Sequence, residues 1–563
     1  MKKYIMLSII VILFTTTLFA ENYLLNGGQQ SQIYYQMVQN VVPNPAMKKL
    51  YLTFVKPVSF QSPTYNQRVS NLSFNFIPQP DNREEYEDKR GNQVIKVTWH
   101  NPRSSIKTII SLIAFNKTIL EPLNTNSVFP IDNVPSDVRP YLTATKQVPS
   151  KNPQITAKAR ELTSGARTEF DAVQRILTWV IDHLHYVLTP SSYEAMYSFN
   201  SGKGNCQNYS HLASALMRAV GIPARIVNGI TLKKPYNIDI GGRTMTLKMA
   251  EGRHSWIEVY FSDLGWVPLD PQQTELFVSN RFIRVEVGLD NNETTQDGLI
   301  RWSQSQGAMA TPHFEEIIES KFSSDKISLT AQRQSYGPKK MLLVPKVQAT
   351  FKQYTPVVEP EPVRIATEQL KGLIYDKPLL FGNLDFPEGL DFLSTRGPAE
   401  QGGGKTYEMK KNFLVETAEY VTSDAQYAQI FILKKPLKMG KIGMALHKFG
   451  DDGQLWVELL KDENGMPAAV IATSDFIPLE NLTTKPGYFW VDFDFSRDWP
   501  VLSPGRYWIA LGFTGSPIVN WFYSYGKPVG PADGTRYKTV LDTEWSKSLA
   551  FEFHYRVIGL TTR

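Results

Sequence analysis

Cysteine is almost absent from this chain, which has 563 residues and only Cys206. A single thiol cannot form a disulfide within the chain, so disulfide stabilisation of the fold is excluded. Free cysteines are often buried as small hydrophobic residues. In an exported protein, however, a free thiol is prone to oxidation, and cysteines are usually paired or lost. A lone cysteine kept in such a protein therefore indicates chemistry rather than packing.

Other features are also missing. The formal net charge is only +6 and no dense block of Lys or Arg occurs, so we predict no nucleic-acid partner. Beyond the N-terminus no stretch approaches the roughly 20 apolar residues of a membrane span, so none is expected in the mature chain. His211 has no second His or Cys at zinc-type spacing. We therefore predict no metal and no cofactor.

The first residues resemble an export signal. Lys2 and Lys3 precede an apolar run over residues 4–14, and three threonines, Leu18, Phe19 and Ala20 follow. Residues 1–20 are therefore predicted to be a signal peptide, with an uncleaved anchor as the alternative. The mature protein is expected to be periplasmic, on the outer surface or secreted.

The remaining chain is predicted to be a multidomain α+β protein. Short alternating runs predict antiparallel β-sandwiches at both ends, and helical periodicity predicts an α+β core between them. The predicted parts are an N-terminal β-sandwich (21–145), a catalytic core (150–290), a mixed segment with Pro- and Gly-rich linkers (291–404) and a C-terminal jelly-roll-like β-sandwich (405–563). The linkers are expected at residues 354–362 and 401–405.

Cys206 lies where a helix is expected to begin. Asn205 is a good N-cap residue, and apolar residues recur at helical spacing until Gly221 and Pro223 end the pattern. Cys206 would then stand in the first turn, where unpaired backbone N–H groups and the helix dipole favour a thiolate. This position suits a nucleophile.

A thiolate nucleophile needs a base, and the base needs a group that orients it. His254 opens a predicted strand, and Asp270 follows the next predicted strand. If these strands form a hairpin across residues 262–265, both side chains lie at the same end. A helix packed across that end would bring Cys206 to them.

Three segments carry a resemblance to a known family. They are Gly204-Asn205-Cys206 with the following run to Gly221-Ile222-Pro223-Ala224-Arg225, then His254-Ser255-Trp256-Ile257-Glu258-Val259, and finally Gly265-Trp266-Val267-Pro268-Leu269-Asp270-Pro271. In this order and spacing they resemble the transglutaminase-like superfamily, which has a papain-like fold. The resemblance implies that Cys206 is the nucleophile, His254 the general base and acid, and Asp270 the orienting carboxylate. The animal enzymes of this family depend on calcium. The resemblance does not imply that dependence here, because no calcium-binding motif is found.

We therefore predict a transglutaminase-like cysteine peptidase or acyltransferase. It would cleave or transfer amide bonds of peptides or proteins through an acyl-thioester on Cys206, and the acceptor stays open between water and an amine. The second oxyanion donor is expected among Tyr186, Tyr197 and Asn200.

The alternative is a non-catalytic cell-surface or carbohydrate-binding protein that uses its β-sandwiches. Six C-terminal tryptophans could include a sugar-stacking platform, although alternation predicts that most face the core. They are Trp456, Trp490, Trp499, Trp508, Trp521 and Trp545. The cluster at residues 520–523 is expected to be the least core-like. An acidic run at residues 81–88 could hold calcium but more often marks a solvated face.

Overall fold

The computed structural model describes most of the chain after residue 21. The described residues are 22–187, 190–240, 242–249, 251–272, 274–296, 298, 300–305, 311–334, 342–343, 365–384, 393–401, 404–411, 418–422, 425–450, 452–483, 489–524, 534–539, 542–545, 547–549 and 551–562. The predicted signal peptide and the predicted linker at 354–362 lie outside them. None of the helices within these ranges is long and apolar enough to cross a membrane.

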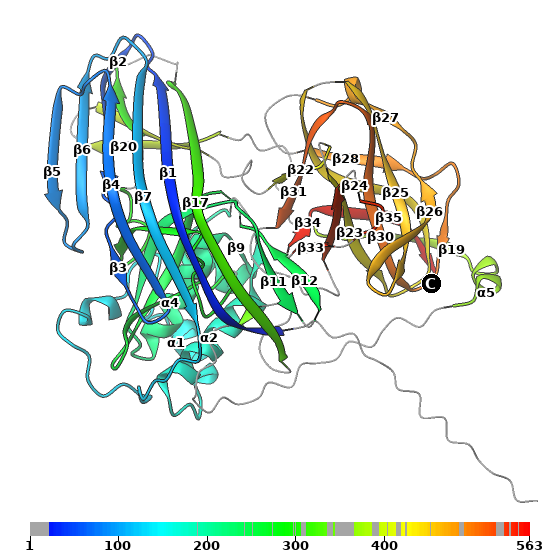
Figure 1. The fold of residues 1–563 in the computed structure, drawn as a ribbon, viewed down its shortest axis with the longest axis horizontal. Helices are drawn as coiled ribbons and strands as arrows, with labels where there is room; N and C mark the ends of the chain where they lie inside the picture. Colours follow the sequence, from blue (N-terminus) through cyan, green and yellow to red (C-terminus); the bar gives the residue numbers. More distant parts are fainter. Residues whose placement is uncertain are drawn as a thin grey trace, which may run out of the picture.

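The N-terminal part is a sandwich of two sheets. The strands of the first sheet are long and antiparallel: β17 (His313–Gln334), β1 (Asn22–Val42), β7 (Ile106–Leu120), β4 (Tyr65–Ile77) and the short β3 (Phe60–Gln61) (Figure 1). The strands of the second sheet are β20 (Leu393–Gln401), β21 (Gly404–Lys411), β16 (Ile300–Gln304), β2 (Met47–Val55), β6 (Gln93–His100) and β5 (Asn82–Glu87). Alternate apolar residues of both sheets, such as Leu50, Leu112 and Trp302, form one buried core.

Strands from much later in the chain complete this sandwich. β17 pairs with β1 along its whole length, β16 pairs with β2, and a two-residue strand, β18 (Leu342–Leu343), extends the pairing of β1. The sequence predicts residues 291–404 to be a mixed segment with linkers. In the structure this segment also contributes strands that complete the N-terminal sandwich. Gln401 and Gly404, at the ends of a predicted linker, are partners in the β20–β21 register. The run at 81–88 includes the edge strand β5, whose Glu85 pairs with Lys56 and Arg83.

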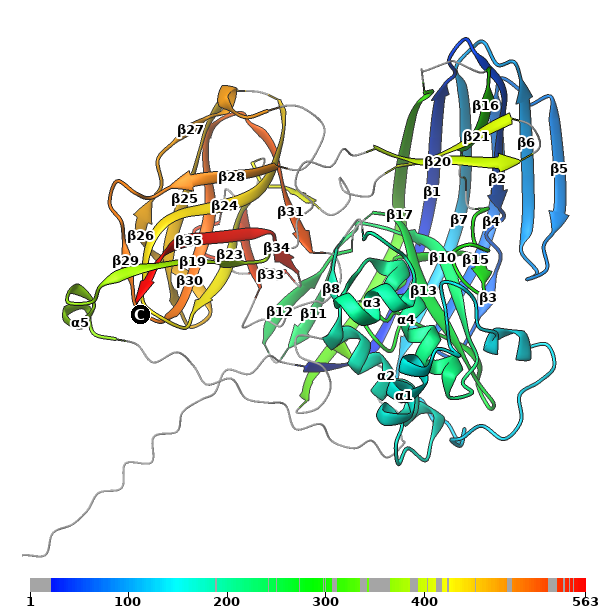
Figure 2. The same ribbon diagram turned by 180° about the vertical axis from the view of Figure 1, so that it is seen from behind.

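The core between the sandwiches is α+β, as predicted. Its antiparallel sheet has the order β14 (Gly265–Leu269), β13 (Gly252–Phe261), β10 (Ala224–Thr231), β15 (Phe282–Gly288). The helices are α1 (Pro153–Leu162), α2 (Glu169–His183), α3 (Ala195–Ser201) and α4 (Cys206–Ala219), with a 3-10 turn η1 (Arg139–Leu142) before them. Figure 2 shows the helices gathered on one side of this sheet, with α4 against β10 and β13. Helix α4 is buried along almost its whole length, so it is the centre of the core.

The C-terminal part is a second two-sheet sandwich. One sheet contains β26 (Met466–Thr473), β25 (Gly453–Glu463), β30 (Gly505–Gly515), β23 (Ala425–Leu433), β32 (Thr535–Thr539) and β33 (Lys547–Leu549), with β27 (Ile477–Pro478) beside β25. The other contains β19 (Tyr375–Gly382), β35 (Tyr555–Thr562), β24 (Leu437–Gly450), β31 (Ile518–Ser524) and β22 (Ala418–Tyr420), with β28 (Phe489–Asp494), β29 (Val501–Leu502) and β34 (Glu552–Phe553) on its strands. A short helix, α5 (Thr367–Lys371), and a 3-10 turn, η3 (Leu479–Asn481), complete this part. A β-sandwich was predicted here, and its jelly-roll character stays a prediction.

A hairpin of the core, β11 (Tyr236–Ile240) and β12 (Arg243–Leu247), lies between the sandwiches. It pairs with β17 through Asp239 and Thr330, and with β33 through Met245 and Ser548. The three parts are therefore joined by backbone hydrogen bonding as well as by the chain.

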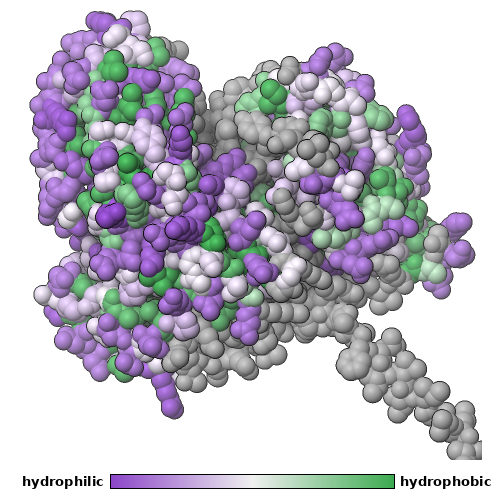
Figure 3. Space-filling model, in the orientation of Figure 1, coloured by the Kyte–Doolittle hydropathy of each residue, from purple (hydrophilic) through white to green (hydrophobic). Residues whose placement is uncertain are grey.

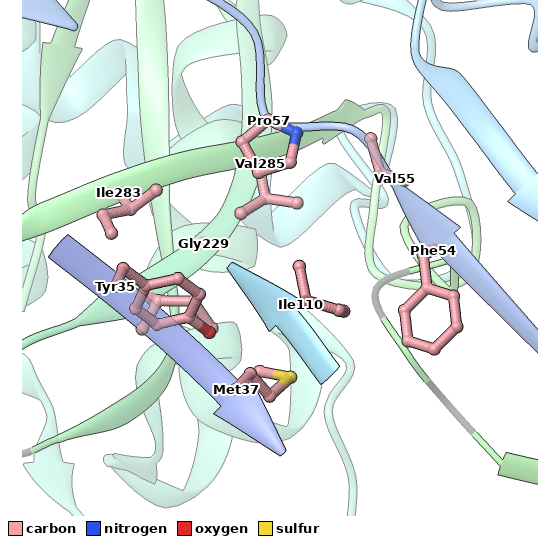
Figure 4. A pocket seen from close by; sticks show the side chains of 10 residues that line it. Tyr35, Met37, Phe54, Val55, Pro57, Ile110, Gly229, Ile283 and Val285 are labelled. Carbon is pink, nitrogen blue, oxygen red and sulfur yellow. The ribbon is translucent and has the colours of Figure 1, made fainter. Parts of the chain in front are cut away.

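The N-terminal sandwich packs directly on the core sheet. Tyr35 and Met37 of β1 and Ile110 of β7 face Ile283 and Val285 of β15 around a cavity of about 40 Å³ (Figure 4). Its lining is almost wholly apolar, and such cavities stay dry, so this contact is structural. The outer surface carries polar and apolar residues in a mixed pattern (Figure 3).

Candidate active site

Cys206 is the first residue of α4. Asn205 caps the helix through a hydrogen bond from the backbone N–H of Gln207 (3.1 Å), and Asn208 completes a capping box by accepting from the N–H of Asn205 (3.2 Å). Gly204 is needed here, because a Cβ atom at this position would stand 2.3 Å from the side chain of Asn208. Cys206 is half-buried, whereas the helix behind it is buried. The predicted cap and the predicted position of the thiol in the first turn are both found.

His254 and Asp270 meet at one end of the β13–β14 hairpin, as their spacing predicted. The two strands pair from Ile257 with Leu269 to Phe261 with Gly265, so both side chains lie at the open end. His254 Nε2 is 3.0 Å from Asp270 Oδ2, and neither side chain is exposed. The thiol of Cys206 also interacts with the imidazole and raises the pKa of His254. Since Nε2 is used by Asp270, Nδ1 is the nitrogen left for the sulfur.

The electrostatics of the pair favour a protonated imidazole. Burial lowers the pKa of His254, but the charge of Asp270 and hydrogen bonds with Asp270 and Cys206 outweigh it and raise the pKa to about 9. His254 therefore carries its second proton at neutral pH. A protonated histidine beside a thiol favours the thiolate, so the arrangement suits an imidazolium–thiolate pair.

Aromatic side chains fix the histidine ring. The ring of Trp256 stacks near that of His254, with centroids 6.0 Å apart, and Phe282 of β15 meets it edge-on at 5.1 Å. Trp256 in turn packs over Gly229, where a Cβ atom would stand 2.4 Å from the indole. Trp256 was part of the family motif, but neither Phe282 nor Gly229 was predicted. Phe282 comes from a strand that carries no local signal for this contact.

Asp270 is held by the turn that follows it. Its Oδ1 accepts from the N–H of Gln272 (3.0 Å), and its carbonyl oxygen accepts from the N–H of Glu275 (2.9 Å). The carboxyl of Glu275 accepts from the hydroxyl of Thr178 on α2 (2.8 Å). The orientation of Asp270 is thus tied to the helical layer as well as to the sheet.

Two contacts fix α4 relative to the sheet. The hydroxyl of Ser210 donates to the carbonyl of Ser255 (3.0 Å), next to His254 in β13. Arg218 donates to the carbonyls of Ala224 (3.0 Å) and Leu289 (2.7 Å). Arg218 therefore ties the helix to the sheet, which keeps the thiol and the imidazole in register.

His211 has no features of a metal ligand. Its Nδ1 is 2.7 Å from the carbonyl of Tyr193, and its Nε2 accepts from the N–H of Asn291 (3.2 Å). Burial lowers its pKa to about 4, so the ring is neutral and serves the core. Within the described ranges no group of three or more His, Cys, Asp or Glu residues could hold a metal ion.

The three candidates for a second oxyanion donor lie on two elements. Tyr186 belongs to β8 (His185–Tyr186), which pairs in parallel with β9 (Lys203–Gly204) directly before Cys206. Tyr197 and Asn200 belong to α3, and Asn200 is exposed. Tyr186 pairs with Gly204, two residues before Cys206.

Comparison with known proteins matches one region of the chain to the same family. The profile of the transglutaminase-like superfamily matches residues 156–271, which contain all three predicted site residues. The uncharacterized protein YebA of Bacillus subtilis (strain 168) is 28% identical over 134 residues, 22% of this chain and 18% of YebA. The uncharacterized protein ML0607 of Mycobacterium leprae (strain TN) is 30% identical over 122 residues, 21% of this chain and 40% of ML0607. The matched region thus spans less than half the length of either relative.

Solved structures align with low scores. A Cytophaga hutchinsonii protein that has been proposed to be a cysteine protease is 16% identical, with a TM-score of 0.39, over 55% of this chain and 100% of that one. The periplasmic domain of TgpA from Pseudomonas aeruginosa, bound to ethylmercury, is 16% identical, with a TM-score of 0.23, over 43% of this chain and 90% of that one.

Proposed function

Because residues 156–271 are a transglutaminase-like region, we propose that this chain is an exported thiol enzyme that cleaves or transfers amide bonds of peptides or proteins. Cys206 is the nucleophile, His254 the general acid and base, and Asp270 the residue that orients the imidazole. The observation that carries this proposal is the buried 3.0 Å contact between His254 and Asp270, beside the thiol at the start of α4. Peptides or proteins are the proposed substrates.

The reaction would proceed in two halves. The thiolate of Cys206 attacks the amide carbonyl, a C–S bond forms, and the oxygen becomes an oxyanion. The backbone N–H of Cys206 at the helix N-terminus is the proposed donor for this oxygen, and the second donor is proposed among Tyr186, Tyr197 and Asn200. When the C–N bond breaks, His254 gives its Nδ1 proton to the departing nitrogen, which leaves a thioester on Cys206.

The second half releases the acyl group. Water or a primary amine attacks the thioester carbonyl and gives a proton to His254, and the C–S bond breaks. Water makes the enzyme a peptidase or amidase, and an amine makes it an acyltransferase. Asp270 keeps the imidazole oriented in both halves.

Mass spectrometry of the intact chain with a peptide library and a primary amine tests this proposal. Cleaved peptides mean hydrolysis of the backbone, loss of ammonia with amine incorporated means transfer, and deamidation alone means hydrolysis of a glutamine side chain. Each product should vanish in Cys206→Ala. Products that persist in this variant would refute the role of Cys206, and a parent chain that forms none of these products would favour the non-catalytic, surface-binding alternative.

A further inference from the structure

A pocket of about 300 Å³ lies on the C-terminal sandwich, on the sheet formed by β25, β30, β23 and β32. Among its lining residues are Gln426, Trp456, Glu458, Gly512, Lys538 and Asp542. It shares no residue with the candidate active site. Its size lies at the lower end of small-ligand pockets, which suits a ligand of one or two rings.

One wall of this pocket is an aromatic plane. Trp456 is partly exposed and lies directly opposite Gly512 in the β25–β30 register. A Cβ atom at Gly512 would stand 2.3 Å from the indole, so the ring lies against the glycine backbone. Its other face is therefore turned away from the sheet. The exposed ring of Phe476, outside the pocket lining, packs against it with centroids 5.0 Å apart.

The other walls carry donors and acceptors of both charges. The carboxylate of Glu458 accepts from the indole N–H of Trp456 (3.3 Å), which holds the ring in place. Asp542 accepts from the hydroxyl of Thr539 (2.8 Å). Lys538 lies on β32, the strand beside β23, and its ammonium is 4.9 Å from the ring of Trp545. Acceptors and a cation therefore face one cavity.

This combination of side chains determines which class of ligand the pocket can bind. A strongly charged ligand would meet repulsion from either Lys538 or the two carboxylates. A neutral ligand with many hydroxyls can donate to Glu458 and Asp542 and accept from Lys538. An aromatic face carries a negative quadrupole that attracts polarised C–H groups. A pyranose ring offers both an apolar C–H face and a rim of hydroxyls.

We infer that this pocket binds a neutral saccharide, with the sugar ring stacked on Trp456 and its hydroxyls bonded to Glu458, Lys538 and Asp542. Two of the other C-terminal tryptophans cannot form such a platform. Trp508 and Trp521 are fully buried, with their indole N–H groups bonded to Asp462 and to the carbonyl of His554. The cluster at 520–523, expected to be the least core-like, is thus core.

Isothermal titration of the full chain with four neutral tetrasaccharides tests the inference: cellotetraose, maltotetraose, mannotetraose and chitotetraose. At least one should bind with a Kd below about 1 mM. Trp456→Ala should weaken this binding at least tenfold, and Glu458→Gln, which keeps the ring, several-fold. Trp499→Ala is the matched control, because Trp499 is a partly exposed tryptophan on the other sheet, against Lys438. It should leave the Kd unchanged.

The outcomes separate this inference from the proposed enzyme. Cys206→Ala should bind the sugar as the parent chain does, since the two sites share no residue. If Trp456→Ala does not fold, as judged by thermal unfolding, Glu458→Gln and Lys538→Gln decide the matter. No binding of any of the four sugars, binding that both polar variants leave unchanged, or binding of only charged peptides would overturn the inference.

Discussion

The Nε2 atom of His254 lies 3.0 Å from Oδ2 of Asp270, and both side chains are fully buried. Because neither side chain is exposed to solvent, the charge of the carboxylate acts on the imidazole with little screening. The contact also selects which ring nitrogen faces Cys206. One interaction therefore sets both the charge and the direction of the imidazole.

Asp270→Asn should remove most of the activity while leaving the fold intact. The amide keeps the shape of the side chain but loses the charge. Without that charge the effect of burial prevails, and the pKa of His254 falls. We expect kcat to fall by about 10²–10⁴-fold. Because Cys206 is the only thiol, its rate of alkylation by iodoacetamide gives a second measure and should fall as well. Asp239→Asn, at an exposed site in β11, is the control and should change neither rate.

The raised pKa of His254 predicts how stability depends on pH. The pKa of His254 is about 9 in the folded state, and its ordinary value is 6.5. Between these pH values the folded state therefore binds a proton that the unfolded state does not. The stabilisation from the ion pair is therefore complete below pH 6.5 and is lost as the pH rises through about 9. Chemical unfolding from pH 6 to pH 10 should show this decline in the parent chain and much less of it in His254→Gln. Parallel curves for the two proteins would contradict the prediction.

Much of the candidate site could be predicted because its signals are local. The cap at Asn205, the helix after it and the hairpin that joins His254 to Asp270 each depend on residues close in sequence. Thr168, the N-cap of α2, is a local signal of the same kind, because its side chain accepts from the backbone N–H of Asp171. Local interactions of this kind can be predicted without a structure.

The completion of the N-terminal sandwich could not be predicted in this way. β1 pairs with β17, which lies almost 300 residues later, and no local pattern specifies a partner at that distance. β17 also carries charged residues such as Glu315 and Lys321 on alternate positions, which weakens its apolar pattern. The same argument applies to Phe282, which reaches His254 only through the pairing of β15 with β10.

Gly229→Ala should impair the candidate active site, because Gly229 contacts Trp256, which packs against His254. The added Cβ would stand 2.4 Å from Trp256 and 2.2 Å from the carbonyl oxygen of Ile283, so both the indole that packs against His254 and the backbone of β15 must shift. We expect a loss of about 1–3 kcal/mol in the free energy of unfolding and slower alkylation of Cys206. Gly450→Ala, where nothing lies within 4 Å of the new Cβ, is the control. A crystal structure of the variant with Trp256 unmoved would rule out this explanation.

Glu169→Gln should stabilise the chain, and by an amount that grows with pH. Glu169 is the first residue of α2 and is fully buried, with a hydrogen bond from Ser127 (2.7 Å). Burial raises its pKa to about 8, and the charge of Asp263 adds to this. The folded state must therefore take up a proton between pH 4.5 and 8, which lowers stability by at most about 1.4 kcal/mol per pH unit.

Glutamine is neutral at every pH and can keep the contact with Ser127, so this loss should be absent from the variant. The difference in unfolding free energy between Glu169→Gln and the parent should be near zero at pH 4.5 and should rise to a plateau above pH 8. Glu161→Gln, at an exposed site in α1, should give a difference close to zero throughout. A constant difference for Glu169→Gln across this range would mean that the carboxyl is already ionised in the folded chain.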